Sequence, residues 1–187
     1  MKFNLLDQIQ TLTDDRIVAV KAVSLGEDYL ADHFPTFPVL PGVLMVEAMV
    51  QAAAWLIHHR TKFTCSVVVL KEAKNVRYGQ FVSPGQTLRV EIDLIRFDEG
   101  FASFKAVGFV VEQATSNGGG TNGGSGNRAA TESQALAARL ELVFFNLADK
   151  DATLARYDAP MKKFTRERFQ ILTSSGMRMP QSAEVLI

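Results

Sequence analysis

Residues 33–57 read HFPTFPVLPGVLMVEAMVQAAAWLI, and this stretch decides how the rest of the chain is interpreted. Its first part holds three prolines within seven residues, which exclude a helix or a central strand and predict a rigid loop. A helix is expected to begin around Pro41–Gly42, because proline is tolerated at a first helical position, and to run to about Arg60. Apolar residues cover nearly the whole circumference of this helix, which predicts that other structure surrounds it on all sides.

The segments on both sides of this helix have the patterns of β-strands. Over Arg16–Leu25 the residues alternate, so that Ile17, Ala19, Lys21 and Val23 share one side. Long runs of β-forming residues predict further strands over Ser66–Tyr78, Thr87–Phe97, Phe101–Val111 and Ala135–Leu147. A short amphipathic segment precedes them all. One long buried helix beside about five mostly antiparallel strands is an α+β architecture.

A glycine-rich segment separates the last two predicted strands. Residues 115–131 contain the run GGGTNGGSG and have no means of packing, so we expect a flexible connection. Alternating polarity resumes after it, which indicates a loop between two paired strands and not a domain boundary. Such an insertion is tolerable because the cost of loop closure grows only slowly with length. We therefore place this loop inside one domain that covers residues 1–148.

The C-terminal extension, residues 149–187, differs in character from that domain. Within it, residues 161–169 read MKKFTRERF and predict a short basic amphipathic helix. The simpler interpretation is a solvated helix that packs on the domain through Phe164 and Phe169. The alternative is a docking patch for an acidic partner.

The composition favours a cytoplasmic protein. The 20 basic and 20 acidic residues cancel, whereas a nucleic-acid partner would favour a basic domain. A single cysteine, Cys65, fits a reducing compartment and is most simply a buried small hydrophobic residue. The N-terminus lacks the apolar run and cleavage site of a signal peptide. The most apolar run, residues 43–57, is short for a membrane span and contains Glu47, so we expect no membrane insertion.

Two polar side chains stand out in the apolar helix. Glu47 and Gln51 are four positions apart and therefore share one helical face. Burial disfavours the charged form of a carboxyl group, and a carboxylic acid that stays protonated near neutral pH can act as a general acid. Glu47 is thus a candidate catalytic acid, and Gln51 could orient it.

The start of the helix and the proline loop supply two further candidates. Gly42 and Val43 present N–H groups without an intrahelical acceptor, where they would stabilise negative charge on a thioester oxygen. Glu47 follows roughly 7–8 Å along the axis at ~1.5 Å per residue, about the span to a β-hydroxyl. His33, fixed by the prolines, is suited to accept and return a proton, although a loop histidine taken alone is more often structural. Together these are the parts needed to eliminate water from a 3-hydroxyacyl thioester.

Other kinds of site have little support in the sequence. His58 and His59 at the helix end fit a favourable interaction with the helix dipole and receive no chemical role. No pair of His, Cys or Asp residues has a recognised metal-ligand spacing, so no metal is expected. A serine-hydrolase elbow and a phosphate-binding glycine loop are both missing.

The residues from His33 to Gln51 form one long motif, His-Phe-Pro-x-x-Pro-Val-x-Pro-Gly-Val-Leu-x-x-Glu-Ala-Met-x-Gln. The motif resembles the signature of bacterial 3-hydroxyacyl-[acyl-carrier-protein] dehydratases of type II fatty acid synthesis, including the 14-residue separation of His33 from Glu47. The similarity continues more loosely from Arg16 to about Val111, and again over Ala135–Phe145. The resemblance implies a hotdog fold, in which an antiparallel sheet wraps one long buried helix.

The resemblance also implies how the parts act. It implies dimers, often trimers of dimers, in which His33 of one subunit and Glu47 of its partner form each active site. In this interpretation the helix from Gly42 supplies the oxyanion donors and the acid, and the histidine comes from the second copy. The substrate would be a (3R)-hydroxyacyl group on the phosphopantetheine arm of acyl carrier protein, converted to a trans-2-enoyl group without a further cofactor. Glu47 and Val43 stand where the isomerising dehydratase has an aspartate and a cysteine, which favours the non-isomerising type.

One departure from the family and two alternative functions remain. Asp32 replaces the glycine usually found before the histidine and would favour the protonated form of His33. A hotdog thioesterase would use Glu47 and Gln51 to direct water at the thioester, and it would not need His33. A non-catalytic subunit that binds acyl carrier protein would keep the scaffold without the activity.

Overall fold

The computed structural model describes residues 3–112 and 132–174 of the 187-residue chain. Within these ranges the strands are β1 (Gln8–Leu12), β2 (Arg16–Ala22), β3 (Val67–Tyr78), β4 (Thr87–Asp98), β5 (Phe101–Val111) and β6 (Glu132–Phe145). The long helices are α1 (Gly42–Arg60) and α2 (Ala155–Thr173), and short 3-10 helices lie over Asp28–Leu30, Leu147–Asp149 and Ala152–Leu154.

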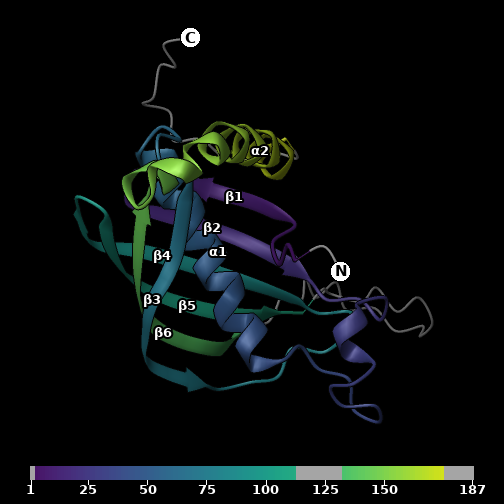
Figure 1. The fold of residues 1–187 in the computed structure, drawn as a ribbon. Helices are drawn as coiled ribbons and strands as arrows, with labels where there is room; N and C mark the ends of the chain where they lie inside the picture. The colour runs from purple at the N-terminus through teal and green to yellow at the C-terminus, as the bar shows by residue number, and fades with distance from the viewer. Residues whose placement is uncertain (1–2, 113–131, 175–187) are drawn as a thin grey trace, which may run out of the picture.

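The strands of the described residues form one six-stranded sheet. Its order is β1-β2-β4-β5-β6-β3, and every neighbouring pair is antiparallel. Figure 1 shows α1 lying across one face of this curved sheet. The predicted α+β class is therefore confirmed, as is an antiparallel sheet curved around a long helix. The sequence indicated only an amphipathic start where the structure has β1.

The alternation predicted for β2 is confirmed, and its buried face includes a charged residue. Ile17 and Ala19 are completely buried, and Lys21 on the same face is only 6% exposed. The Lys21 Nζ lies 2.6 Å from an oxygen of Glu27 and 3.5 Å from an oxygen of Asp7. A buried charge is costly unless it is paired, so the two carboxylates explain how a lysine occupies this position.

The strands on either side of the glycine-rich segment pair directly with each other. The pairing of β5 with β6 extends from Phe101↔Val143 to Val111↔Glu132. The predicted pairing is therefore confirmed. The connecting residues 115–131 lie outside the described ranges. Leu136, Leu140 and Leu142 of β6 are completely buried in the core that α1 shares.

Helix α1 begins at Gly42 and ends at Arg60, as the sequence predicts. The residues that it buries in the core include Met45, Met49, Ala52, Ala53, Leu56 and Ile57. The expectation that other structure surrounds α1 on all sides is wrong within this chain. Val43 is 72% exposed, and Glu47 and Gln51 are only half-buried. A single sheet covers one side of a helix, so a stripe on the other side stays open.

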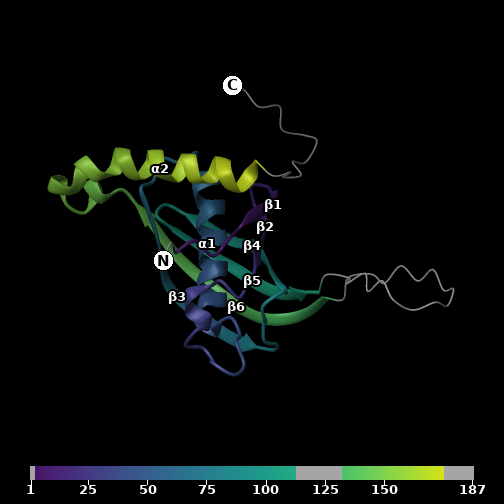
Figure 2. The ribbon, with the colours of Figure 1, turned by 90° about the vertical axis from the view of Figure 1, so that its right-hand side faces the viewer.

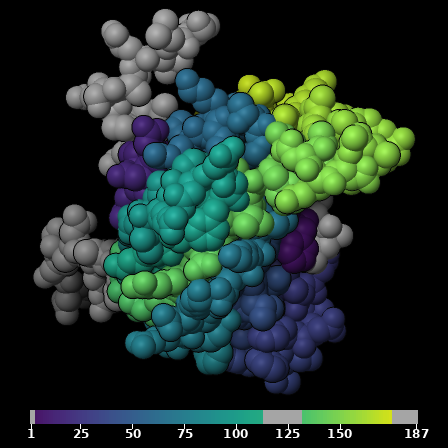
Figure 3. All heavy atoms as spheres, turned by 60° about the vertical axis from the view of Figure 1, so that its left-hand side comes forward, coloured from purple at the N-terminus to yellow at the C-terminus, as the bar shows by residue number. Residues whose placement is uncertain are grey.

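Helix α2 extends beyond both ends of the helix predicted over 161–169. It crosses the C-terminal end of α1 (Figure 2), where the ring centroids of Phe169 and Trp55 are 5.9 Å apart. Phe164 is 62% exposed, so the expected packing through this residue is wrong. Phe164 and Phe169 lie roughly 140° apart around the helix, so they cannot pack on the same part of the domain. Leu172, 2% exposed, packs in the core instead, and Figure 3 shows α2 as a yellow-green ridge beside the strands.

A buried carboxylate ties α2 to the end of β6. The Asp158 carboxylate accepts hydrogen bonds from the N–H groups of Leu147 at 2.8 Å and Ala148 at 3.1 Å, and from the Ser66 hydroxyl. The hydrogen bond from Ser66 holds the pKa of Asp158 below its ordinary value. The first part of α2 is therefore fixed by polar contacts, in contrast to the apolar contacts at its end.

Two smaller expectations concern the cysteine and the membrane. Cys65 is 5% exposed, which confirms that it is buried, and this burial raises the pKa of its thiol. None of the helices in the described residues is long and apolar enough to cross a membrane.

Candidate active site

His33 is held by the loop that leads into α1. Its Nδ1 lies 3.1 Å from the carbonyl oxygen of Val39, and the Val39 N–H donates back to the His33 carbonyl at 3.2 Å. Val39 itself is completely buried, so this anchor is fixed by the core. Because a carbonyl oxygen only accepts, the Nδ1 carries the hydrogen, and the Nε2 of the neutral ring is left as a proton acceptor.

His33 and Gly42 line the same cavity, which has a volume of about 350 Å³. Most of the other lining residues are apolar or aromatic, among them Phe34, Leu40, Met45, Tyr78 and Phe81. A largely apolar cavity with a few polar groups is the usual form of a small-molecule site. The proton acceptor and the start of α1 are therefore brought together within one chain.

The first N–H groups of α1 are free to bind a ligand. The N–H groups of Leu44 and Met45 donate to the Pro41 carbonyl, at 2.9 and 3.1 Å. The N–H groups of Gly42 and Val43 have no acceptor among the described residues. They lie at the positive end of the helix dipole, which is suited to hold a developing negative charge.

The ring of Tyr78 leaves little room for a Cβ atom at position 42, which favours glycine there. The sequence did not indicate this contact. A Cβ atom at position 42 would lie 2.8 Å from Cε1 of Tyr78. Tyr78 stands at the end of β3, so the partners are 36 positions apart in the chain. The aromatic ring therefore forms a wall against the donors of the helix start.

Glu47 and Gln51 are hydrogen-bonded to each other, as their spacing predicts. The Gln51 Nε2 donates to Glu47 Oε1 at 3.0 Å and to the Phe3 carbonyl at 3.2 Å. The Gln51 Oε1 accepts from the N–H of Leu5 at 2.9 Å. The amide is thus fixed by the N-terminal segment and in turn orients the Glu47 carboxylate. The expected full burial of Glu47 is wrong within this chain, because the helix stripe that carries it is open.

Glu47 does not line the cavity that His33 and Gly42 share. It follows Gly42 by five residues, which turns its side chain roughly 140° around the helix axis. Within this chain, the Gly42 donors and Glu47 of the same helix therefore do not line one common cavity.

The remaining candidates have no part in this geometry. Asp32 is exposed and forms no ion pair or hydrogen bond within the described residues. His58 is buried, and burial lowers its pKa to about 4, so the expected interaction of a charged His58 with the helix dipole is wrong. Over residues 3–112 and 132–174, no three His, Cys, Asp or Glu side chains are grouped so that they could hold a metal ion.

A six-stranded antiparallel sheet curved around a long helix, with a loop histidine and the helix start in one cavity, defines a hotdog-fold protein. A family model described as FabA-like domain matches residues 1–115, which is more than half of the chain. The chain therefore belongs to the FabA-like domain family. The match ends before β6 and α2, so Arg168 and its neighbours in α2 lie outside the matched region.

Individual relatives agree with this family. The chain is 35% identical over 108 residues to the 3-hydroxyacyl-[acyl-carrier-protein] dehydratase FabZ of Clostridium perfringens, covering 58% of this chain and 78% of that relative. It is 39% identical over 117 residues to the FabZ of Solibacter usitatus, covering 60% and 72%. The solved structure of the dehydratase heterocomplex ApeI:P from Xenorhabdus doucetiae has a TM-score of 0.57 at 19% identity, covering 81% of this chain and 90% of that one. The last similarity supports the hotdog fold.

Proposed function

We propose that this chain dehydrates (3R)-hydroxyacyl groups on acyl carrier protein to trans-2-enoyl groups. One observation carries the proposal: His33 and Gly42, at the start of α1, line the same largely apolar cavity. A base and an oxyanion site must act on the same thioester, on its C2 proton and on its oxygen respectively. FabZ relatives at 35% and 39% identity support the same reaction.

The mechanism follows from the hydrogen bonds of the site. The Nε2 of His33 removes a proton from C2, while the Val39 carbonyl stabilises the imidazolium through Nδ1–H. The N–H groups of Gly42 and Val43 donate to the thioester oxygen as it gains negative charge. A protonated Glu47 then gives its proton to the C3 hydroxyl, which leaves as water. Glu47 and Val43 at these positions favour a dehydratase that does not isomerise the double bond.

The acid comes from a second copy of the chain in this proposal. Glu47 lies outside the His33 cavity of its own chain, on the open stripe that includes the 72% exposed Val43. The edge strand β3 also leaves Val69 43% and Leu70 38% exposed, which fits a surface covered by another copy. We therefore propose a homodimer, alone or within a trimer of dimers. Each site combines His33 and Gly42 of one chain with Glu47 of the partner subunit.

The substrate is proposed to arrive on the phosphopantetheine arm of acyl carrier protein, and no further cofactor is part of the reaction. The elimination needs only proton transfers and the stabilisation of one oxyanion, which the side chains and backbone supply. A cytoplasmic reaction agrees with the single, buried Cys65.

A direct assay separates the candidate activities. The protein is incubated with 3-hydroxyacyl thioesters, and enoyl absorbance and free thiol are followed together. We expect enoyl product without thiol release. Thiol release without enoyl product would indicate a thioesterase, and neither signal would indicate a non-catalytic carrier-binding subunit.

Subunit exchange tests the shared site. His33→Ala and Glu47→Gln proteins are each expected to be nearly inactive alone, because each lacks a proton-transferring group in every site. A mixture that exchanges subunits should regain activity, since some sites then combine an intact His33 with an intact Glu47. Exchange is followed independently by native mass spectrometry of a tagged variant. Demonstrated exchange without any regained activity would contradict the shared site.

A further inference from the structure

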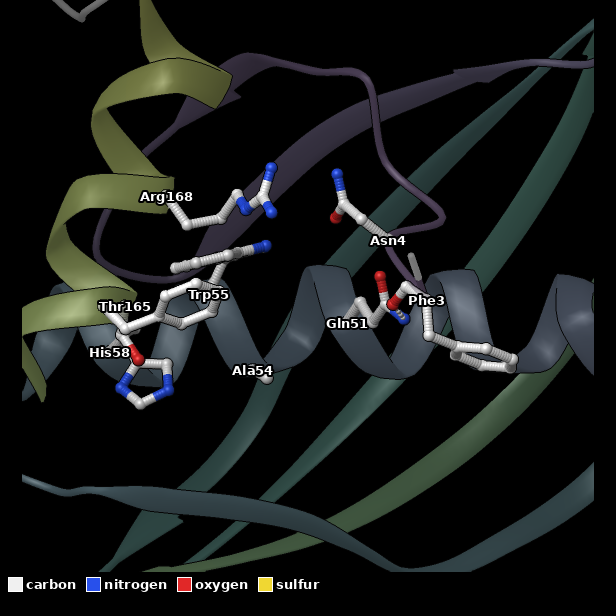
Figure 4. A pocket seen from close by; sticks show the side chains of 9 residues that line it. Phe3, Asn4, Gln51, Ala54, Trp55, His58, Thr165 and Arg168 are labelled. Carbon is white, nitrogen blue, oxygen red and sulfur yellow. Dashed lines mark hydrogen bonds between the residues drawn. The ribbon is translucent and has the colours of Figure 1, made fainter. Parts of the chain in front are cut away.

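A second cavity lies at the other end of α1 and belongs to no part of the proposed mechanism. Its volume is about 490 Å³, it is open to solvent, and residues of the N-terminal segment, α1 and α2 line it (Figure 4). Its walls include the side chains of Phe3, Ala54, Trp55 and Phe164. These apolar walls suit a hydrocarbon chain, and α2 closes the end that is farthest from Gly42.

Two hydrogen-bond donors in this cavity have no acceptor. The guanidinium of Arg168 and the indole nitrogen of Trp55 lie near each other in the cavity, and the Asn4 side chain faces them (Figure 4). Neither Arg168 nor the Trp55 indole N–H donates a hydrogen bond within the described residues, and the Arg168 guanidinium lies over the Phe164 ring, 5.7 Å from its centroid. A guanidinium and an indole N–H can only donate, so their complement is an acceptor.

The charge of this cavity is positive. Arg168 carries the one formal charge among its lining residues, because burial keeps His58 neutral with a pKa of about 4. No carboxylate lines it. The planar guanidinium matches a carboxylate in shape as well as in charge, and such charge-assisted hydrogen bonds are the strong ones.

Gln51 connects this cavity to the catalytic acid. It lines the cavity and donates to Glu47 at 3.0 Å. Glu47, Gln51 and Trp55 are spaced by four residues, so they form one stripe along α1. Trp55 lies roughly 12 Å beyond Glu47 at ~1.5 Å per residue. A chain whose C3 hydroxyl meets Glu47 can therefore extend along this stripe into the cavity.

We propose that this cavity binds the far end of the acyl group and that Arg168 and Trp55 select chains that end in a carboxylate. The substrate class is then a 3-hydroxyacyl thioester with a carboxylate at its distal carbon. This inference rests on the proposed dehydration, which sets where C3 lies. Arg168 belongs to α2, outside the region matched by the family model, so the selection is a property of this chain's own C-terminal part.

The test compares two substrates that differ only at the distal end. A 3-hydroxyacyl N-acetylcysteamine thioester ending in a carboxylate is compared with its methyl ester, which has nearly the same shape without the charge. Neither contains a phosphate, so the phosphate of the phosphopantetheine arm makes no contribution. We expect wild type to have the higher kcat/KM for the carboxylate, mainly through a lower KM.

Three variants locate this preference. Arg168→Gln should reduce the ratio of the two kcat/KM values by roughly tenfold to a hundredfold, the scale of one charged hydrogen bond. Trp55→Phe keeps the aromatic wall and should reduce the ratio by about fivefold, the scale of one neutral hydrogen bond. Lys163→Gln removes an exposed charge from the same helix and should leave the ratio unchanged. The far-ultraviolet circular dichroism spectrum and the thermal unfolding midpoint of each variant show whether it is folded.

Other outcomes would overturn the inference. Equal kcat/KM values of wild type for both substrates would contradict the carboxylate selection. If Arg168→Gln slows only substrates on acyl carrier protein, and slows both distal ends equally, Arg168 binds the carrier or its phosphate instead. If no substrate is dehydrated, the proposed function fails by itself. Calorimetric titration with the unreactive saturated ω-carboxyacyl thioester then still tests the cavity, because Arg168→Gln should weaken this binding and Lys163→Gln should not.

Discussion

The two cavities at the ends of α1 differ in the kind of charge that they can hold. At the start of the helix, the cavity offers the imidazole of His33 and the N–H groups beside Gly42, without a permanently charged side chain. At the far end, the permanent charge of Arg168 stands in an apolar wall. Neutral donors suit a charge that exists only during the reaction, whereas a guanidinium suits a ligand that is always charged. In our proposal, catalysis and substrate selection therefore lie at opposite ends of one helix.

The strongest way to break this comparison is to remove the base. His33→Ala should lower kcat/KM by about 10²–10⁴-fold, the usual contribution of a positioned general base. The preference for a distal carboxylate should persist in the residual activity, because Arg168 is untouched. Steady-state rates on the two matched thioesters measure both quantities. His59→Ala is the matched control and should keep wild-type rates. A His33→Ala protein with nearly wild-type rates would mean that another group acts as the base.

A smaller effect is expected from closing the space above the first N–H groups. In Gly42→Ala the new Cβ would meet Cε1 of Tyr78 at 2.8 Å, so the ring or the helix start must move. Displaced donors should lower kcat/KM by about tenfold to a hundredfold. This effect does not exceed that of removing one oxyanion donor completely. Overpacking should also lower the free energy of unfolding by about 1–3 kcal/mol.

Tyr78 provides the control for this substitution. If the contact is the cause, Gly42→Ala should cost much less stability when Tyr78→Ala is already present. Denaturant unfolding of the four proteins gives this coupling free energy directly. Additive effects would show that Gly42 is needed for a reason other than the approach of Tyr78.

The smallest expected effect is a pH dependence of stability that comes from His58, which lines the second cavity. Burial lowers the pKa of His58 from 6.5 to about 4 in the folded chain, so on acidification the unfolded chain takes up this proton first. Stability present above pH 6.5 is therefore lost as the pH falls toward 4, by at most about 3 kcal/mol. His58→Phe keeps a ring that can stack on Phe63, at 6.0 Å in wild type, and should lack this part of the pH dependence. If the free energies of unfolding of both proteins change in parallel from pH 7 to pH 4, His58 is not the source of this pH dependence.

Local patterns predicted the parts of the molecule that depend on neighbours in the chain. The limits of α1 followed from the prolines before it, and the pairing of β5 with β6 followed from alternation on both sides of one loop. The hydrogen bond between Glu47 and Gln51 followed from their spacing. In each case the physical cause acts within a few residues or within one pair of adjacent strands.

Features that depend on distant contacts could not be predicted in the same way. Tyr78 lies on Gly42 only because the sheet returns β3 to the start of α1. The second cavity joins Phe3, Trp55 and Arg168, which no local pattern relates. The open stripe of α1 was misjudged because an apolar sequence predicts burial without saying which chain provides the cover.

The hydrogen bonds of Gln51 have a practical and an evolutionary consequence. Its amide contacts the backbone of Phe3 and Leu5 and none of their side-chain atoms, at 3.2 and 2.9 Å. Substitutions at these two positions are therefore limited by packing, because Phe3 lines the second cavity and Leu5 is buried in the core, and not by the hydrogen bonds that orient Glu47. A purification tag fused directly before residue 3 could shift the path of the backbone and so alter turnover, while a tag at the C-terminus would leave it in place. Activity measured on N-terminally tagged protein should therefore be compared with that of the cleaved form.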